Sequence, residues 1–182
     1  CTKIYAKHKK ALDLIYEYRP DDRTQYLDAI QSALEKAAEE GRILYSKDSS
    51  NGSSFLYHTI TMDQYLPRLK TKDSSWGTDF IYQYWIRFRE NKVCGIFEIG
   101  GWNVPEKSME NMQRMIGILK PNDKRKEKFR YKRLFRTKWY EVKESEHIQE
   151  DFFICTKRVI EELLHQEKDL LRKMSAQESE SQ

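Results

Sequence analysis

The sequence lacks any apolar run of the length that a membrane-spanning helix requires, which is about 18 residues or more. Its N-terminus also lacks the basic, apolar and small-residue regions of a signal peptide. We therefore expect a soluble, cytoplasmic protein that has no membrane partner.

Cysteine and glycine are scarce as well. Three cysteines, Cys1, Cys94 and Cys155, stand far apart in 182 residues, and this pattern predicts reduced packing residues, without a disulfide framework or a zinc site. Four histidines are scattered without the spacing of metal ligands: His8, His58, His147 and His165. Among the seven glycines, Gly100-Gly101 has no phosphate-loop spacing. We therefore expect no metal ion or cofactor in this chain.

What the sequence does contain is charge and aromatic side chains, at 34% and 13% of residues, with 38% hydrophobic residues. A chain of 182 residues can build one sizeable core, and large aromatic rings can supply buried area that aliphatic residues would otherwise provide. We expect a single α+β domain over residues 1–174 and a disordered polar tail over 175–182. Because the chain opens at Cys1, already at the start of a predicted helix, we expect a C-terminal fragment of a longer protein.

The strongest structural pattern runs from residue 78 to residue 140. Residues 80–88 alternate between an apolar side, which begins with Phe80 and Tyr82, and a mixed side made of Ile81, Gln83, Trp85 and Arg87. Residues 93–99 predict the second strand of an antiparallel hairpin. Residues 105–120 place methionines at helical spacing, and residues 129–140 predict a third, basic strand. We expect the methionine side of this helix to cover the apolar side of the sheet.

Further elements flank this centre. Periodicity and end signals predict helices over 2–18, 22–41 and 145–172, and strands over 43–45 and 55–60. Residues 62–69 fit either a short helix or an irregular segment. The fold class is therefore α+β, with an antiparallel or mixed sheet of about four to six strands flanked by helices.

A magnesium-dependent nuclease needs carboxylates on adjacent strands and a nearby lysine. Asp79 and Glu98 stand on the two arms of the predicted hairpin, but Gly100 occupies the position where the lysine is needed. The Glu-x-Lys triplets at 90–92 and 141–143 follow a strand or lie in a turn. We therefore predict no catalytic residue and no metal site in this chain.

The basic strand is the remaining functional signal. Ten Lys or Arg residues lie between Lys120 and Lys138, against Asp123 and Glu127. Arginine and lysine interleaved with aromatic residues favour nucleic acid, since phosphate neutralisation and base stacking then add. The predicted nucleic-acid contacts are Lys128, Arg130, Lys132, Arg133, Arg136 and Lys138. The alternative is a solvated strand face that carries charge for solubility and edge protection.

The order of several motifs resembles the C-terminal, non-catalytic half of bacterial proteins of the PD-(D/E)XK nuclease superfamily. The motifs are Lys7-His8-x-x-Ala11-x-x-x-Ile15, Tyr18-Arg-Pro-Asp-Asp-Arg23, Trp76-Gly77 and Phe97-Glu-Ile-Gly-Gly101. The resemblance covers nearly the whole chain and implies an accessory domain in defence against foreign DNA. Its partner would be a nuclease-like N-terminal domain of the same protein, which would hold the catalytic residues and any magnesium ion.

Three functions follow from these observations. The first is an accessory, non-catalytic module that contacts nucleic acid through the basic strand. The second is a protein-interaction or regulatory module that binds no nucleic acid. The third is a metal-dependent nuclease complete in this chain.

Overall fold

The computed structural model describes residues 8–9, 22–49, 54–72, 76–101, 103–121, 131–143 and 145–180. These residues form an α+β fold, as the sequence predicted. The strands are β1 (Leu44–Tyr45), β2 (Ser54–His58), β3 (Tyr82–Arg89), β4 (Lys92–Gly100), β5 (Tyr131–Arg136) and β6 (Tyr140–Glu141). The helices are α2 (Asp22–Glu39), α3 (Ile60–Tyr65), α4 (Glu106–Leu119) and α5 (Ile148–Glu180), with a 3-10 turn at Lys47–Ser49.

The strands form one antiparallel sheet in the order β1-β2-β3-β4-β5, and β6 pairs with the start of β4. Strands β3 and β4 are its long central hairpin. The predicted alternation of β3 is confirmed, because Tyr82, Tyr84, Ile86 and Phe88 are buried on one side. Tyr84 lies opposite Phe97 of β4, and their rings stack with centroids 4.5 Å apart.

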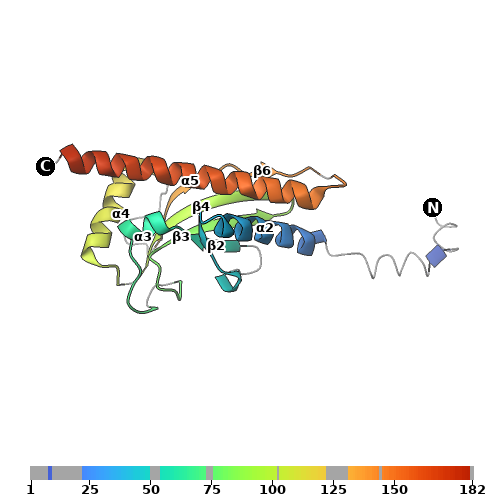
Figure 1. Cartoon of the computed structure of the whole chain (residues 1–182), viewed down its shortest axis with the longest axis horizontal. Helices are drawn as coiled ribbons and strands as arrows, with labels where there is room; N and C mark the ends of the chain where they lie inside the picture. The colour runs from blue at the N-terminus through green and yellow to red at the C-terminus, as the bar shows by residue number, and fades with distance from the viewer. Residues whose placement is uncertain are drawn as a thin grey trace.

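Helices α2 and α5 lie against each other on this apolar side of the sheet (Figure 1). Helix α5 comes closest to β4 at Gly95. A Cβ atom built on Gly95 would lie 2.5 Å from Cδ1 of Leu163 and 2.7 Å from Cγ1 of Val159. Such distances are well inside ordinary van der Waals contact, so the absence of a side chain at Gly95 lets the helix rest on the sheet.

The predicted role of helix α4 is only partly met. We expected its methionines to cover the apolar side of the sheet, but α5 packs there, and α4 stands at the end of the sheet against α5 and β5 (Figure 1). Met112 and Met115 join the core, whereas Met109 is 42% exposed. Helix α5 is much longer than α4, has more buried apolar residues and contacts both central strands.

Two predictions concern the ends of the chain. The helix predicted over 2–18 lies outside the described residues, except for His8 and Lys9. The tail predicted to be disordered from Ser175 is helical as far as Glu180, the end of α5. Arg114 of α4 holds this extension, since it donates hydrogen bonds to the carboxylate of Glu178 and to the backbone carbonyl of Met174, both within 2.8 Å.

Candidate functional site

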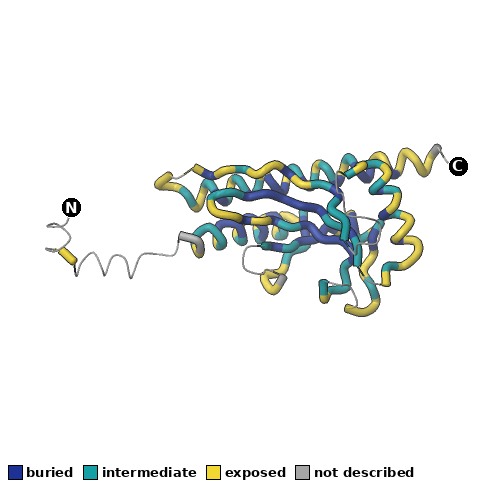
Figure 2. Tube along the Cα trace, turned by 180° about the vertical axis from the view of Figure 1, so that it is seen from behind, coloured by how far each residue is buried: buried dark blue, intermediate teal, exposed yellow. Residues whose placement is uncertain are grey.

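Three arginines lie on the side of the sheet opposite α2 and α5: Arg87, Arg133 and Arg136. In Figure 2, which views the molecule from behind, the strands lie in front of these helices. Residues that pair directly across antiparallel strands share a face. By this register, one face holds Ser54 and Leu56 of β2, Gln83, Trp85 and Arg87 of β3, Cys94, Ile96 and Glu98 of β4, and Arg133 and Arg136 of β5. We call these residues the open face.

A β-bulge decides which basic residues reach the open face. Phe97 pairs with Phe135 on the apolar side, but Glu98 pairs with Arg133, so Leu134 is an extra residue in β5. Without the bulge, period-two alternation would put Arg133 on the same side as Phe135. The bulge instead places Arg133 and Arg136 together on the open face.

The arginines of the open face gather around a buried cysteine. Burial raises the pKa of Cys94 to about 11, and the charges of Arg136, Arg87 and Arg133 act in the opposite direction. Arg133 also forms an ion pair with Glu98, with Nη2 and Oε1 3.4 Å apart. The face therefore concentrates three positive charges beside one negative charge.

The other predicted contacts are not on this face. Lys132 pairs with Ile99, a core residue, so its side chain starts on the side of the sheet that the helices cover. We expected Lys132 and Arg136 to contact nucleic acid together, but they lie on opposite sides of the sheet. Lys138 follows β5 and places its ammonium group 5.0 Å from the ring centroid of Tyr140. Lys128 and Arg130 lie outside the described residues. The basic residues of β5 therefore lie on both sides of the sheet: Arg133 and Arg136 on the open face, and Lys132 on the side of the helices.

Two residues of the open face were missed as functional candidates. Trp85 and Arg87 belong to the mixed side of β3, whose composition was visible in the sequence. What the sequence lacked was the pairing that places them beside Arg133 and Arg136. Arg87 and Arg136 are both exposed, and Trp85 is half-buried.

The two hairpin carboxylates do not come together as a metal site. Asp79 precedes β3, which begins at Tyr82, so it does not stand on the hairpin arm where we expected it. Glu98 does lie on β4, where Arg133 is its ion-pair partner. Among the residues that the structure describes, no group of three or more His, Cys, Asp or Glu side chains could hold a metal ion.

A second polar cluster lies inside the core, between α5, β3 and the start of α3. The buried carboxylate of Glu167 accepts hydrogen bonds from the hydroxyl of Tyr84, at 2.5 Å, and from that of Thr59, at 2.9 Å. Burial raises the pKa of Glu167, while these two hydrogen bonds lower it. The hydroxyl of Tyr82 lies 2.8 Å from the carbonyl oxygen of Thr59 and 2.7 Å from a carboxylate oxygen of Asp63, and its single proton can be donated to either. These bonds tie α5 to the sheet and fix the start of α3.

His58 lies beside this cluster in a stack of three side chains. Its ring is parallel to that of Phe80, with centroids 3.3 Å apart, and the guanidinium of Arg68 lies 4.3 Å from the Phe80 centroid. Burial lowers the pKa of His58 to about 3, and the charge of Arg68 acts in the same direction. His58 is therefore a neutral packing residue near neutral pH.

The described helices include none that is both long and apolar enough to span a membrane. No family model, curated protein or solved structure matches this chain. The evidence for a candidate site therefore comes from the geometry of the open face alone.

Proposed function

We propose that this chain is an accessory, non-catalytic module that contacts nucleic acid through the open face of its sheet. The observation that carries the proposal is the gathering of Arg87, Arg133 and Arg136 beside Trp85 on one face. Arginine side chains neutralise phosphates, and an aromatic ring offers a surface for base stacking. Around Trp85, the charges of Arg87, Arg133 and Arg136 stand against the one negative charge of Glu98, the ion-pair partner of Arg133.

The proposed partner in the same protein is a nuclease-like domain. This part of the proposal rests on the resemblance of motifs such as Phe97-Glu-Ile-Gly-Gly101 to PD-(D/E)XK proteins. That domain would supply the magnesium ion and the cleavage chemistry, and the module described here would help to hold the nucleic acid in defence against foreign DNA.

The salt dependence of binding tests the proposal. Fluorescence anisotropy would give the affinity of the full chain for a labelled oligonucleotide over a salt series that starts at about 50 mM. Each phosphate contact contributes about −0.7 to −0.9 to the slope of log affinity against log salt. The double variant Arg87→Gln/Arg136→Gln should therefore bind more weakly and reduce the slope by up to about 1.4–1.8.

The matched control is Lys168→Gln/Lys173→Gln. It removes the same charge from exposed positions of α5, the helix that covers the other side of the sheet. We expect its slope to equal that of the wild type. Equal slopes for all three proteins, or no binding at the lowest salt, would contradict the proposed function.

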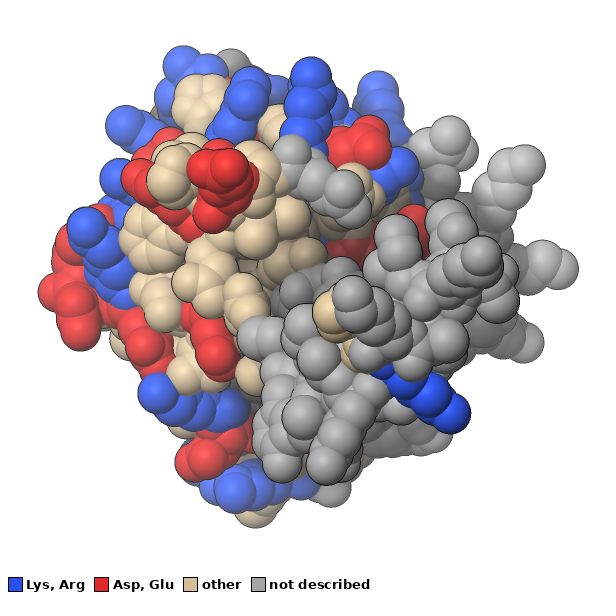
Figure 3. All heavy atoms as spheres, turned by 90° about the vertical axis from the view of Figure 1, so that its right-hand side faces the viewer, with Lys and Arg blue, Asp and Glu red and all other residues tan. Residues whose placement is uncertain are grey.

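The alternative is a protein-interaction module, and a different surface favours it. At the end of the molecule seen in Figure 3, acidic and basic residues border an area without charged residues. Two large apolar side chains are exposed among the described residues that follow β5: Trp139, at 36%, and Ile154, at 56%. A chain that binds no nucleic acid at any salt concentration would favour this function.

A further inference from the structure

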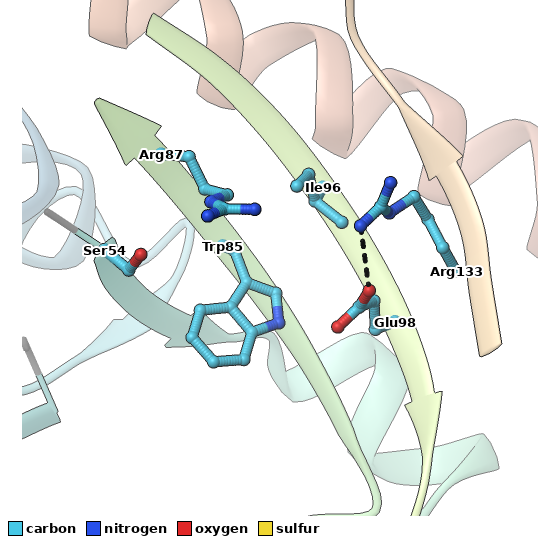
Figure 4. Close-up of a pocket in the computed structure, with 6 residues that line it drawn as sticks. All are labelled: Ser54, Trp85, Arg87, Ile96, Glu98 and Arg133. Atoms are coloured by element: carbon cyan, nitrogen blue, oxygen red, sulfur yellow. Dashed lines mark hydrogen bonds and ion pairs between the residues drawn. The ribbon is translucent and has the colours of Figure 1, made fainter. Parts of the chain in front are cut away.

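The open face contains a hollow of about 230 Å³ (Figure 4). Six residues from β2, β3, β4 and β5 line it: Ser54, Trp85, Arg87, Ile96, Glu98 and Arg133. Their side chains stand on the near side of the strands in Figure 4, while a helix passes behind the sheet. Drug-sized ligands occupy pockets of about 300–1,000 Å³. This smaller hollow suits a single planar ring system.

One buried polar atom at the hollow and two in a neighbouring side chain have no hydrogen-bond partner among the described residues. The indole nitrogen of Trp85 and both amide atoms of Gln83 make no hydrogen bond to any residue that the structure describes. Gln83 is fully buried, stands two residues before Trp85 on the same face, and pairs with Glu98, which lines the hollow. Most buried polar atoms in proteins are hydrogen-bonded, and leaving one unpaired is costly. The indole nitrogen of Trp85, which lines the hollow, therefore points to a ligand that carries a hydrogen-bond acceptor.

A nucleobase has the chemistry that the hollow offers. Its ring can lie against the indole of Trp85 and the apolar side chain of Ile96, which is buried. The ion pair of Glu98 and Arg133 presents an acceptor and a donor to the edge of a base. The exposed guanidinium of Arg87 stands at the same hollow, where it can meet a phosphate.

We infer that this hollow binds one unpaired base, so that the ligand of the open face is single-stranded nucleic acid and not an intact duplex. In a duplex, neighbouring base pairs cover both faces of each base, and no ring is free to stack on a side chain. This inference rests on the proposed function, because it assumes that the open face binds nucleic acid. It adds to that function that the nucleic acid is single-stranded and that Trp85 stacks on one of its bases.

The test compares three ligands: a mixed-sequence single strand of about 12 nucleotides, an abasic strand of the same length, and the duplex of the same sequence. Two variants of the full chain are measured with each. Trp85→Leu removes the aromatic ring, and Trp85→Phe keeps a ring that can stack. Stacking of one base contributes about 1–3 kcal/mol, which corresponds to about a 5- to 150-fold change in affinity.

We expect Trp85→Leu to weaken binding of the normal single strand by such a factor and to leave the abasic strand and the duplex unchanged. Trp85→Phe should keep most of the affinity for the single strand. Trp139→Leu is the control, since this exposed tryptophan lies in a separate hollow with Arg89, Glu90 and Lys92 at the hairpin turn. It should change none of the three affinities.

The outcomes separate the inference from the proposed function. If the wild type binds the normal and abasic strands equally well, the inference is overturned even if Trp85→Leu fails to fold. The same holds if Trp85→Leu weakens all three ligands equally or none of them. In both cases, salt-dependent binding that requires Arg87 and Arg136 would leave the proposed function standing. If the wild type binds none of the ligands, both the function and the inference are wrong.

Discussion

Replacing Gly95 by alanine tests the packing of α5 on the sheet. The new methyl carbon would meet Leu163 Cδ1 at 2.5 Å, Val159 Cγ1 at 2.7 Å and Leu163 Cγ at 2.8 Å. Carbon atoms in contact prefer about 3.5–4.0 Å, so these groups must move by roughly 1 Å. Val159 and Leu163 are fully buried, and hydrogen bonds to Glu167 hold the same helix nearby.

The expected effect is a net loss of stability. Overpacking a well-filled core costs about 1–3 kcal/mol. Alanine in a strand gains about 0.5–1 kcal/mol over glycine, because the unfolded chain loses less freedom. We therefore expect Gly95→Ala to lower the free energy of unfolding by about 1 kcal/mol, within the range of about 0–2.5 kcal/mol that the difference between these two effects allows.

Urea unfolding followed by circular dichroism would measure this change. The control is Gly117→Ala in helix α4, where an added Cβ atom would have no neighbour within 4 Å. Since alanine is the better helix former, the control should gain up to about 1 kcal/mol. Opposite signs for two identical substitutions would show that the contact with α5 decides the outcome.

A double variant makes the test sharper. Leu163→Ala alone should cost about 2–5 kcal/mol, because it leaves a cavity. In Gly95→Ala/Leu163→Ala the new methyl group enters that space, so the two losses should fail to add by about 0.5–3 kcal/mol. If Gly95→Ala is as stable as the wild type, or if the two losses simply add, α5 does not pack on Gly95 as closely as described here.

Two further predictions concern pH and the core. The folded state holds the pKa of His58 near 3, below its ordinary 6.5. The contribution of His58 to stability is therefore present above pH 6.5 and is lost as pH falls toward 3. His58→Phe, which keeps the stack on Phe80, should reduce the slope of the free energy of unfolding against pH in this range by up to about 1.4 kcal/mol per pH unit. Equal slopes in acid urea titrations would contradict this. Burial raises the pKa of Glu167 above 4.5, so its favourable contribution is present below pH 4.5 and is lost as pH rises through the raised value. Glu167→Gln should therefore gain stability relative to the wild type between about pH 4 and pH 8, and a constant difference would refute the prediction.

Local patterns determined much of the fold. Alternation along residues 80–88 predicted the buried side of β3, because successive side chains of a strand point to opposite faces whatever the rest of the chain does. The periods of helices α2, α4 and α5 were likewise visible in the sequence, and so was the gathering of basic residues around β5. The candidate site was predicted only in part, since Arg133 and Arg136 were named and Trp85 and Arg87 were not.

The rest depended on contacts between residues far apart in the chain. The bulge at Leu134 turns Arg133 toward the open face, and only the pairing of β5 with β4 specifies it. Which helix packs on the apolar side of the sheet also depended on such contacts: α5, which has more buried apolar residues than α4, lies against β3 and β4. The sequence by itself determined where most of the strands and helices lie, because propensity and periodicity act over a few residues. Only the tertiary structure decided which strand faces meet, because register and layer order depend on the packing of the whole chain.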